Sequence, residues 1–111
     1  MTSKNRTIGK LLTTSNVDLY EVPANYETNV KSIFVNNASS SFAYFSLDWY
    51  DAQTDTWHTV AESVPVVGNA MLQITQSLWL YKGDKFRGLC DAADSITLVF
   101  NIEEFYIPTR R

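Results

Sequence analysis

The chain has 111 residues, a length typical of one domain built around one hydrophobic core. Hydrophobic residues make up 45% and charged residues 19%, which excludes a disordered or low-complexity chain. The net charge of −3 lacks the basic field that a general nucleic-acid binder needs. We therefore expect a single domain over residues 1–111 with no direct nucleic-acid partner.

Short β-prone runs separated by turn residues fill the first half of the chain, which is typical of a sandwich or barrel. Strands are predicted over 8–13, 17–22, 30–35, 42–51 and 57–61. The strand 42–51 is the clearest, because residues alternate between an apolar and a more polar face. The apolar face carries Phe45, Leu47 and Trp49, and the other carries Tyr44, Ser46, Asp48 and Tyr50.

The second half continues the pattern, with strands predicted over 71–75, 78–81, 86–90 and 96–102. The segment 62–67 contains a proline and is predicted to be an edge strand or a linker. In the last strand, Ile96, Leu98, Phe100 and Ile102 share a face, and Glu103-Glu104 is expected to break the register. Leu72 and Ile74 are expected to point inward. No window shows sustained helical periodicity, so we predict an all-β antiparallel sandwich or jelly roll of eight or nine strands.

The charges are unevenly placed along the chain. No Lys or Arg lies between Ser32 and Tyr81, whereas basic residues gather near both ends. We expect two short arms, residues 1–7 and 108–111, and the basic side chains in them are candidates for contacts between subunits. These candidates are Lys4, Arg6, Arg110 and Arg111. No apolar run suggests a signal peptide or a membrane span, so we expect synthesis in a cytoplasm and no membrane partner.

The residues offer little catalytic chemistry. His58 is the only histidine and Cys90 the only cysteine, so a catalytic triad or a structural zinc site would need partners that the chain lacks. Cys90 shares a face with Phe86 and is predicted to be a buried thiol. Glu103 and Glu104 are adjacent on a strand and are expected to point to opposite faces, so they cannot act as an acid–base pair. We predict no enzyme activity, no metal site and no cofactor.

The outward aromatic side chains are the feature that a core does not explain. Tyr44 and Tyr50 lie opposite the apolar face of their strand, with Asp48 between them and Trp57 on the next strand. If that face meets solvent, it is a surface for a protein partner or for a glycan. The alternative is that both faces of the strand are covered within the fold.

Two segments resemble small phage virion structural proteins of the sandwich or jelly-roll type. One runs from Val17-Asp18-Leu19-Tyr20-Glu21-Val22-Pro23-Ala24-Asn25 through Val30-Lys31-Ser32-Ile33-Phe34-Val35-Asn36-Asn37. The other is Leu78-Trp79-Leu80-Tyr81-Lys82-Gly83-Asp84-Lys85-Phe86, and the likeness covers about residues 13–102. The resemblance implies a protein that oligomerises in a particle and brings no catalytic residues. The aromatic richness and the two-arginine tail depart from the pattern.

From the sequence we therefore expect a virion protein made in the host bacterial cytoplasm. A capsid decoration or cement protein comes first, and a tail, neck or fibre component second. It would self-associate and dock on other virion proteins such as major capsid, portal or tail subunits. A carbohydrate- or receptor-binding module that uses the outward tyrosines and Asp48 is the alternative from another class.

Overall fold

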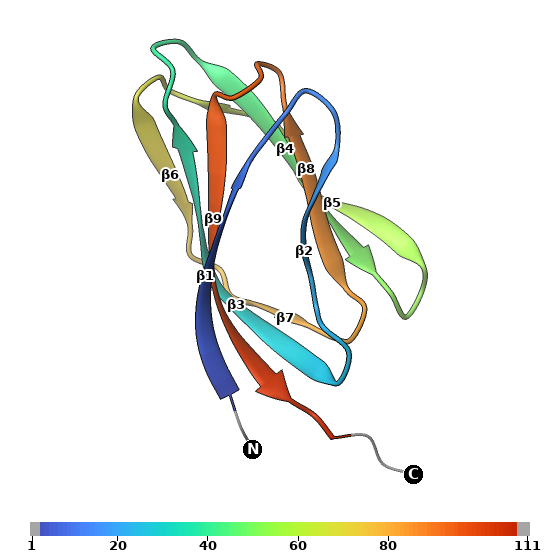
Figure 1. The fold of residues 1–111 in the computed structure, drawn as a ribbon. Coiled ribbons are helices and arrows are strands. Elements are labelled where there is room, and N and C mark those ends of the chain that lie inside the picture. Colours follow the sequence, from blue (N-terminus) through green and yellow to red (C-terminus); the bar gives the residue numbers. More distant parts are fainter. Residues whose placement is uncertain (1–2, 109–111) are drawn as a thin grey trace.

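The computed structural model describes residues 3–108, which form nine strands and no helix (Figure 1). The strands are β1 (Ser3–Leu11), β2 (Val17–Glu21), β3 (Tyr26–Asn37), β4 (Ala43–Asp51), β5 (Thr56–Val66), β6 (Ala70–Ile74), β7 (Leu78–Leu80), β8 (Lys85–Cys90) and β9 (Ile96–Tyr106). Within these residues there is no helix long and apolar enough to cross a membrane. The predicted all-β class is confirmed.

The strands form two antiparallel sheets whose pairing is nested. One sheet has the order β1-β9-β3-β6, with β7 also paired to β3, and the other has the order β2-β8-β4-β5. The first strand thus pairs with the last, β2 pairs with β8, and β4 pairs with β5. A long hairpin folded over on itself gives this arrangement, which is the jelly-roll form of the β-sandwich.

The core lies between the two sheets and is filled by every second residue of the long strands. The inward faces predicted for 42–51 and for 96–102 are confirmed, since Phe45, Leu47 and Phe100 are at most 1% exposed. The rings of Phe86 and Phe100 stack across the two sheets with centroids 5.4 Å apart. Each such side chain contributes about 1.5–3 kcal/mol by its removal from water. Cys90 is buried in the same layer, as predicted.

Two sequence-based expectations are corrected by the strand pattern. β9 runs without a break to Tyr106, so Glu104 continues the inward face after Ile102 and is itself fully buried. β1 begins at Ser3, which places Lys4 in a paired strand and not in an arm. Leu72 lies opposite the buried Val35 and so shares the inner face, but it stays 38% exposed because β6 is a short strand at the edge of its sheet.

Other boundaries differ by smaller amounts. The segment 62–67 is no linker, because β5 extends through Glu62 to Val66 as the edge strand of its sheet. The turn at Lys82-Gly83-Asp84 is as expected, with Gly83 at a φ of 85°. Glu103 and Glu104 do point to opposite faces, and only the first reaches solvent. The arm residues Arg110 and Arg111 lie outside the described residues.

The sandwich has two ends with different loops (Figure 1). The connections β1–β2, β3–β4, β5–β6 and β8–β9 lie at the upper end of the view. The turns β2–β3, β4–β5 and β7–β8 lie at the lower end, where β1 also begins and β9 ends. The outer face of the β2-β8-β4-β5 sheet runs between these ends and carries four of the eight predicted contact residues, Tyr44, Asp48, Tyr50 and Trp57.

Candidate interaction surfaces

Residues 3–108 contain no cluster of three or more His, Cys, Asp or Glu side chains that could hold a metal ion. His58 pairs with Trp49 and Cys90 pairs with Phe45, four positions apart on β4, which is about 13 Å along a strand. The Cys90 thiol is buried and donates to the Ala92 carbonyl at 2.9 Å. His58 is exposed, and its ring stacks on Trp49 with centroids 5.0 Å apart.

The lower half of the outer face of the β2-β8-β4-β5 sheet carries a cation–aromatic cluster, formed by Asp48, Tyr50, Trp57, Lys85 and Arg87. The guanidinium carbon of Arg87 lies 3.9 Å from the ring centroid of Trp57, and its Nε lies 3.1 Å from the Asp48 carboxylate. The Tyr50 and Trp57 rings are 5.0 Å apart, and Lys85 Nζ lies 5.3 Å from the Tyr50 centroid. The structure thus brings three predicted contact residues together with two cations.

Strand register explains why these side chains meet. Tyr50 is opposite Trp57 on β5 and opposite Lys85 on β8, and Asp48 is opposite Arg87. Sequence reasoning missed the two cations, although their alternation with inward Phe86, Gly88 and Cys90 signals an outward face. The Tyr50 hydroxyl donates to the Asp55 carboxylate, and this hydrogen bond raises the pKa of the Tyr50 phenol.

In the cation–aromatic cluster, the aromatic rings are partly covered by other side chains of the same cluster. Arg87 covers one face of Trp57, which leaves the indole only partly accessible. A sugar ring stacks on a free aromatic face, so a glycan would have to use the remaining side or displace Arg87. The predicted glycan-binding role remains a prediction, and the geometry of this cluster gives it no added support.

The upper half of the same face carries an apolar patch, formed by Phe42, Tyr44, Pro65 and Val67. Tyr44 lies opposite Pro65, and Ala43 lies opposite Val66, so the continued register sets Phe42 beside Val67. Phe42 is 60% exposed, Val67 56% and Tyr44 43%, and Pro65 is also exposed. Sequence reasoning found Tyr44 alone. The period-two pattern also places Phe42 on this face. Pro65 and Val67 could not be assigned to it, because the sequence predicts that the strand starting at residue 57 ends at residue 61.

A buried asparagine fixes the loops that present the apolar patch. Asn37 is fully buried, and its Nδ2 donates to the carbonyls of Ser41 at 2.8 Å and Val66 at 2.9 Å. Its Oδ1 accepts from the backbone N–H of Ser39 at 2.9 Å. At Gly68 a Cβ atom would lie 2.5 Å from the Ser40 backbone, so only glycine permits this approach. Phe42 and Val67 are thus held at fixed positions and not on loose loops.

The predicted contact residues Lys4 and Arg6 bind within the chain. Both lie on β1 and point toward Glu104, with Arg6 Nη1 at 3.1 Å from Oε2 and Lys4 Nζ at 3.8 Å from Oε1. The Tyr20 hydroxyl donates to the same Oε2 at 2.6 Å and lies 2.8 Å from Thr28 Oγ1. Burial and this hydrogen bond raise the pKa of the Tyr20 phenol well above its ordinary value. These cations therefore stabilise a buried carboxylate.

Three of the outer strands, β1, β2 and β5, oppose the addition of a further strand. On β1 the residues Lys4, Arg6 and Lys10 lie on the inner side, and inward-pointing charges guard an edge. β5 contains Pro65, has Ser63 at a φ of 49°, and is interrupted by register shifts against β4. β2 carries a register shift between Asp18 and Tyr20. The remaining edge strand, β6, carries no charge, proline or register shift.

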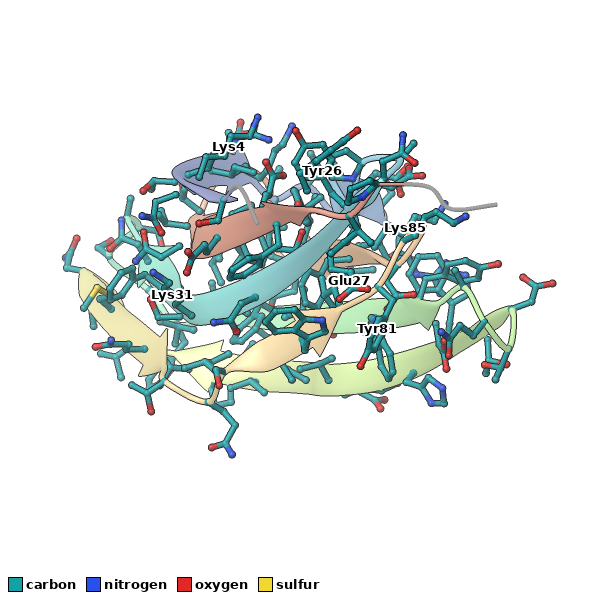
Figure 2. All side chains as sticks on the ribbon, turned by 90° about the horizontal axis from the view of Figure 1, so that it is seen from below. Lys4, Tyr26, Glu27, Lys31, Tyr81 and Lys85 are labelled. Atoms are coloured by element: carbon teal, nitrogen blue, oxygen red, sulfur yellow. The ribbon has the colours of Figure 1, made fainter. Side chains whose placement is uncertain are left out.

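The lower end has two open hollows that share Glu27 and Lys82. One is about 250 Å³ and also involves Tyr26, Ile107 and Pro108, and the other is about 510 Å³ and extends to Tyr81. Figure 2, a view onto this end, shows the labelled side chains of Tyr26, Glu27, Tyr81 and Lys85 spread around it. Glu27 already accepts a hydrogen bond from Trp79 Nε1 at 2.9 Å. Both hollows are open to solvent and include the charged side chains of Glu27 and Lys82.

A third and smaller cavity opens at the flank where β5 faces β7 across the two sheets. This flank cavity is about 90 Å³ and is lined by the apolar side chains of Trp49, Val60, Leu78, Trp79 and Leu80. Val60 is 40% and Trp79 43% exposed, so the cavity reaches the surface. The Trp49 indole Nε1 is buried and has no hydrogen-bond partner among residues 3–108.

Comparisons with known proteins give a fold and no family. No protein-family model and no curated protein matches the sequence. The chain is similar to a Bacillus endospore appendage from a family of disulfide-linked pili, with 12% identity and a TM-score of 0.56. That match covers 96% of this chain and 88% of the other, and at this identity it establishes the shared fold alone.

A second solved structure is the CBM22-1 and GH10 modules of xylanase 10B from Clostridium thermocellum, complexed with xylohexaose. The identity is 11% and the TM-score 0.39, over 98% of this chain. The chain spans only 27% of that protein's length. At this TM-score the likeness carries no argument about sugar binding.

Proposed function

We propose that this chain is a non-catalytic structural subunit that works by non-covalent association with copies of itself in a larger particle or appendage. The observation that carries this proposal is the apolar patch. Phe42, Tyr44 and Val67 are each more than 40% exposed and lie at the paired ends of β4 and β5, where Asn37 binds the carbonyls of Ser41 and Val66. Contiguous exposed apolar surface on a rigid frame is typical of a protein–protein contact.

The finer form of the proposal is a phage virion protein, made in the host bacterial cytoplasm and incorporated in the particle. It is supported by the resemblance of the segments around Pro23-Ala24-Asn25 and Lys82-Gly83-Asp84 to small virion proteins. Capsid decoration or cement is the leading role, and a tail, neck or fibre component the second. A jelly roll similar in fold to an appendage subunit is compatible with either, since both are repeated subunits.

Analytical ultracentrifugation of the purified full chain, from about 1 µM to 1 mM, tests the general proposal, since this range spans weak to moderate association. We expect the average mass to rise with concentration, and negative-stain microscopy to show particles of more than one copy. A chain that stays monomeric over the whole range overturns self-association.

The virion form has its own test. Mass spectrometry of purified phage particles induced from the source strain should find the chain at a fixed ratio to the major capsid protein. Its absence from particles, together with self-association in solution, would favour an appendage of the cell.

A further inference from the structure

We propose that the apolar patch of one copy docks in the flank cavity of the next, so that subunits join head to tail. The inference rests on the proposed self-association and names the surfaces that carry it. The knob is the pair Phe42 and Val67, and the hole is lined by Trp49, Val60, Leu78, Trp79 and Leu80.

The hole fits an apolar side chain by chemistry. All five of its lining residues are apolar, whereas each hollow of the lower end includes the charged pair Glu27 and Lys82. Burying an apolar knob against those charges would cost desolvation that the flank cavity avoids. The second copy's apolar patch is therefore matched to this cavity and not to the larger hollows.

The hole also fits by size. A volume of about 90 Å³ equals the share of about three water molecules in the liquid, which suits a branched aliphatic side chain or the outer part of a phenyl ring. Phe42 and Val67 project such groups side by side. One of them can enter the cavity while the other covers its rim, as anchor residues and their neighbours do in interfaces.

The Trp49 indole is a second observation at the same cavity. Its Nε1 is a buried donor with no partner in the described chain, and an unmet buried donor is costly. Because this atom is buried, a carbonyl of the docked copy would reach it only with a shift of the Trp49 side chain. Docking at the cavity should therefore change the surroundings of the indole.

The knob and the hole cannot meet within one molecule. Val60 lies in β5 and Val67 directly follows that strand, seven residues along the chain, which is about 20 Å. The patch lies on the outer face, while the cavity opens between the sheets. The contact would therefore join two different surfaces of two copies. Such a heterologous contact leaves one knob and one hole open at the ends, so it builds rings or open chains.

Two variants and their mixture test this geometry. Phe42→Ser removes the knob and keeps the hole, whereas Val60→Trp fills the hole and keeps the knob. Each alone should associate about tenfold to a hundredfold more weakly than the parent chain, since a buried Phe side chain is lost or excluded. An equimolar mixture should form one-to-one dimers that do not grow further. Met71→Ser, which alters an equally exposed residue of the other sheet, is the matched control and should associate normally.

The outcomes separate this inference from the proposed function. If the parent chain and both variants associate equally, the chain self-assembles through other surfaces and the inference is wrong. If Phe42→Ser abolishes association and Val60→Trp does not, the patch meets a surface other than the cavity. A parent chain that never associates overturns both ideas.

A measurement on the unaltered chain guards against misfolded variants. In a concentration series of ¹H–¹⁵N spectra, the indole resonance of Trp49 should shift on association, and that of Trp57 should shift much less. A Trp49 resonance that stays constant while the protein associates would also sink the docking geometry.

Discussion

The two halves of one sheet face differ in how their exposed aromatic side chains are used. In the lower half, Trp57 has Arg87 on its ring face, and Tyr50 has Trp57, Lys85 and Asp55. In the upper half, Phe42, at 60% exposed, lies beside another exposed apolar side chain. The same strand, β4, supplies Tyr50 to one half and Tyr44 to the other.

The difference shows that an outward aromatic residue is not by itself a contact site. Where neighbouring strands supply cations and a carboxylate, the ring makes its cation–aromatic contacts within the chain and stabilises the fold. Where they supply Pro65 and Val67, the apolar surface stays exposed and is available to a partner. Substitutions beneath the apolar patch, in the buried network and on the face itself test how each group of side chains is used.

The largest effect is expected at the asparagine beneath the apolar patch. Asn37→Ala removes hydrogen bonds to Ser41, Val66 and Ser39 and leaves buried carbonyls unpaired, so the free energy of unfolding should fall by about 3 kcal/mol. Urea denaturation followed by fluorescence measures this. Asn36→Ala, at the adjacent exposed position, should change it by less than about 0.5 kcal/mol. Equal effects at both positions would mean that the Asn37 hydrogen bonds do not fix the position of the apolar patch.

A smaller effect is expected from the buried network at the lower end. Tyr20→Phe removes the hydrogen bond to the Glu104 carboxylate, and the free energy of unfolding at neutral pH should fall by about 2 kcal/mol. The pKa of Tyr20 is higher in the folded chain than the ordinary value of about 10, so its stabilising effect is complete below that pH. As the pH rises above 10 this contribution is lost.

The two curves should therefore approach each other in alkali. Denaturation of the parent chain and of Tyr20→Phe at a series of pH values from neutral to alkaline measures the gap. A gap that stays constant above pH 10 would show that the Tyr20 proton is not linked to folding.

The smallest changes in the free energy of unfolding are expected from substitutions in the two halves of the face themselves. Arg87→Ala should lower the free energy of unfolding by about 1 kcal/mol, because it removes a half-buried ion pair and a cation–aromatic contact. Phe42→Ser should leave it within about 0.5 kcal/mol while it weakens self-association. The reverse pattern, with the patch needed for folding and the cluster for association, would invert the roles assigned to the two halves.

Much of the fold follows from local pattern. Alternation in 42–51 and 96–102 correctly gave the inward faces, and Gly83 correctly marked a turn. The start of β1 at Ser3 was missed because Ser3–Thr7 has no apolar face. Its pairing comes from β9 and from bonds such as Ser3 to Glu103, which lie 100 residues apart in the chain. That hydrogen bond also lowers the pKa of the Glu103 carboxyl.

The candidate surfaces were harder to predict than the strands. Tyr44, Asp48, Tyr50 and Trp57 were found as outward residues, but period two says nothing about which neighbours lie beside them. Register between β4, β5 and β8 decides that Arg87 meets Trp57 and that Pro65 lies opposite Tyr44. Glu104 was misjudged for a related reason. A carboxylate inside a core is unexpected until Tyr20 and Arg6 arrive from other strands to pair with it.

The single cysteine has a consequence for how an assembly of this chain would behave. The similar appendage belongs to a family of disulfide-linked pili. Here Cys90 is 1% exposed, and its thiol donates a hydrogen bond to the Ala92 carbonyl. Covalent locking through this thiol would require the upper end of the core to open. Contacts between copies would thus remain reversible, and terminal subunits would dissociate on dilution even under oxidising conditions. Length and lifetime would then be set by the supply of free subunits.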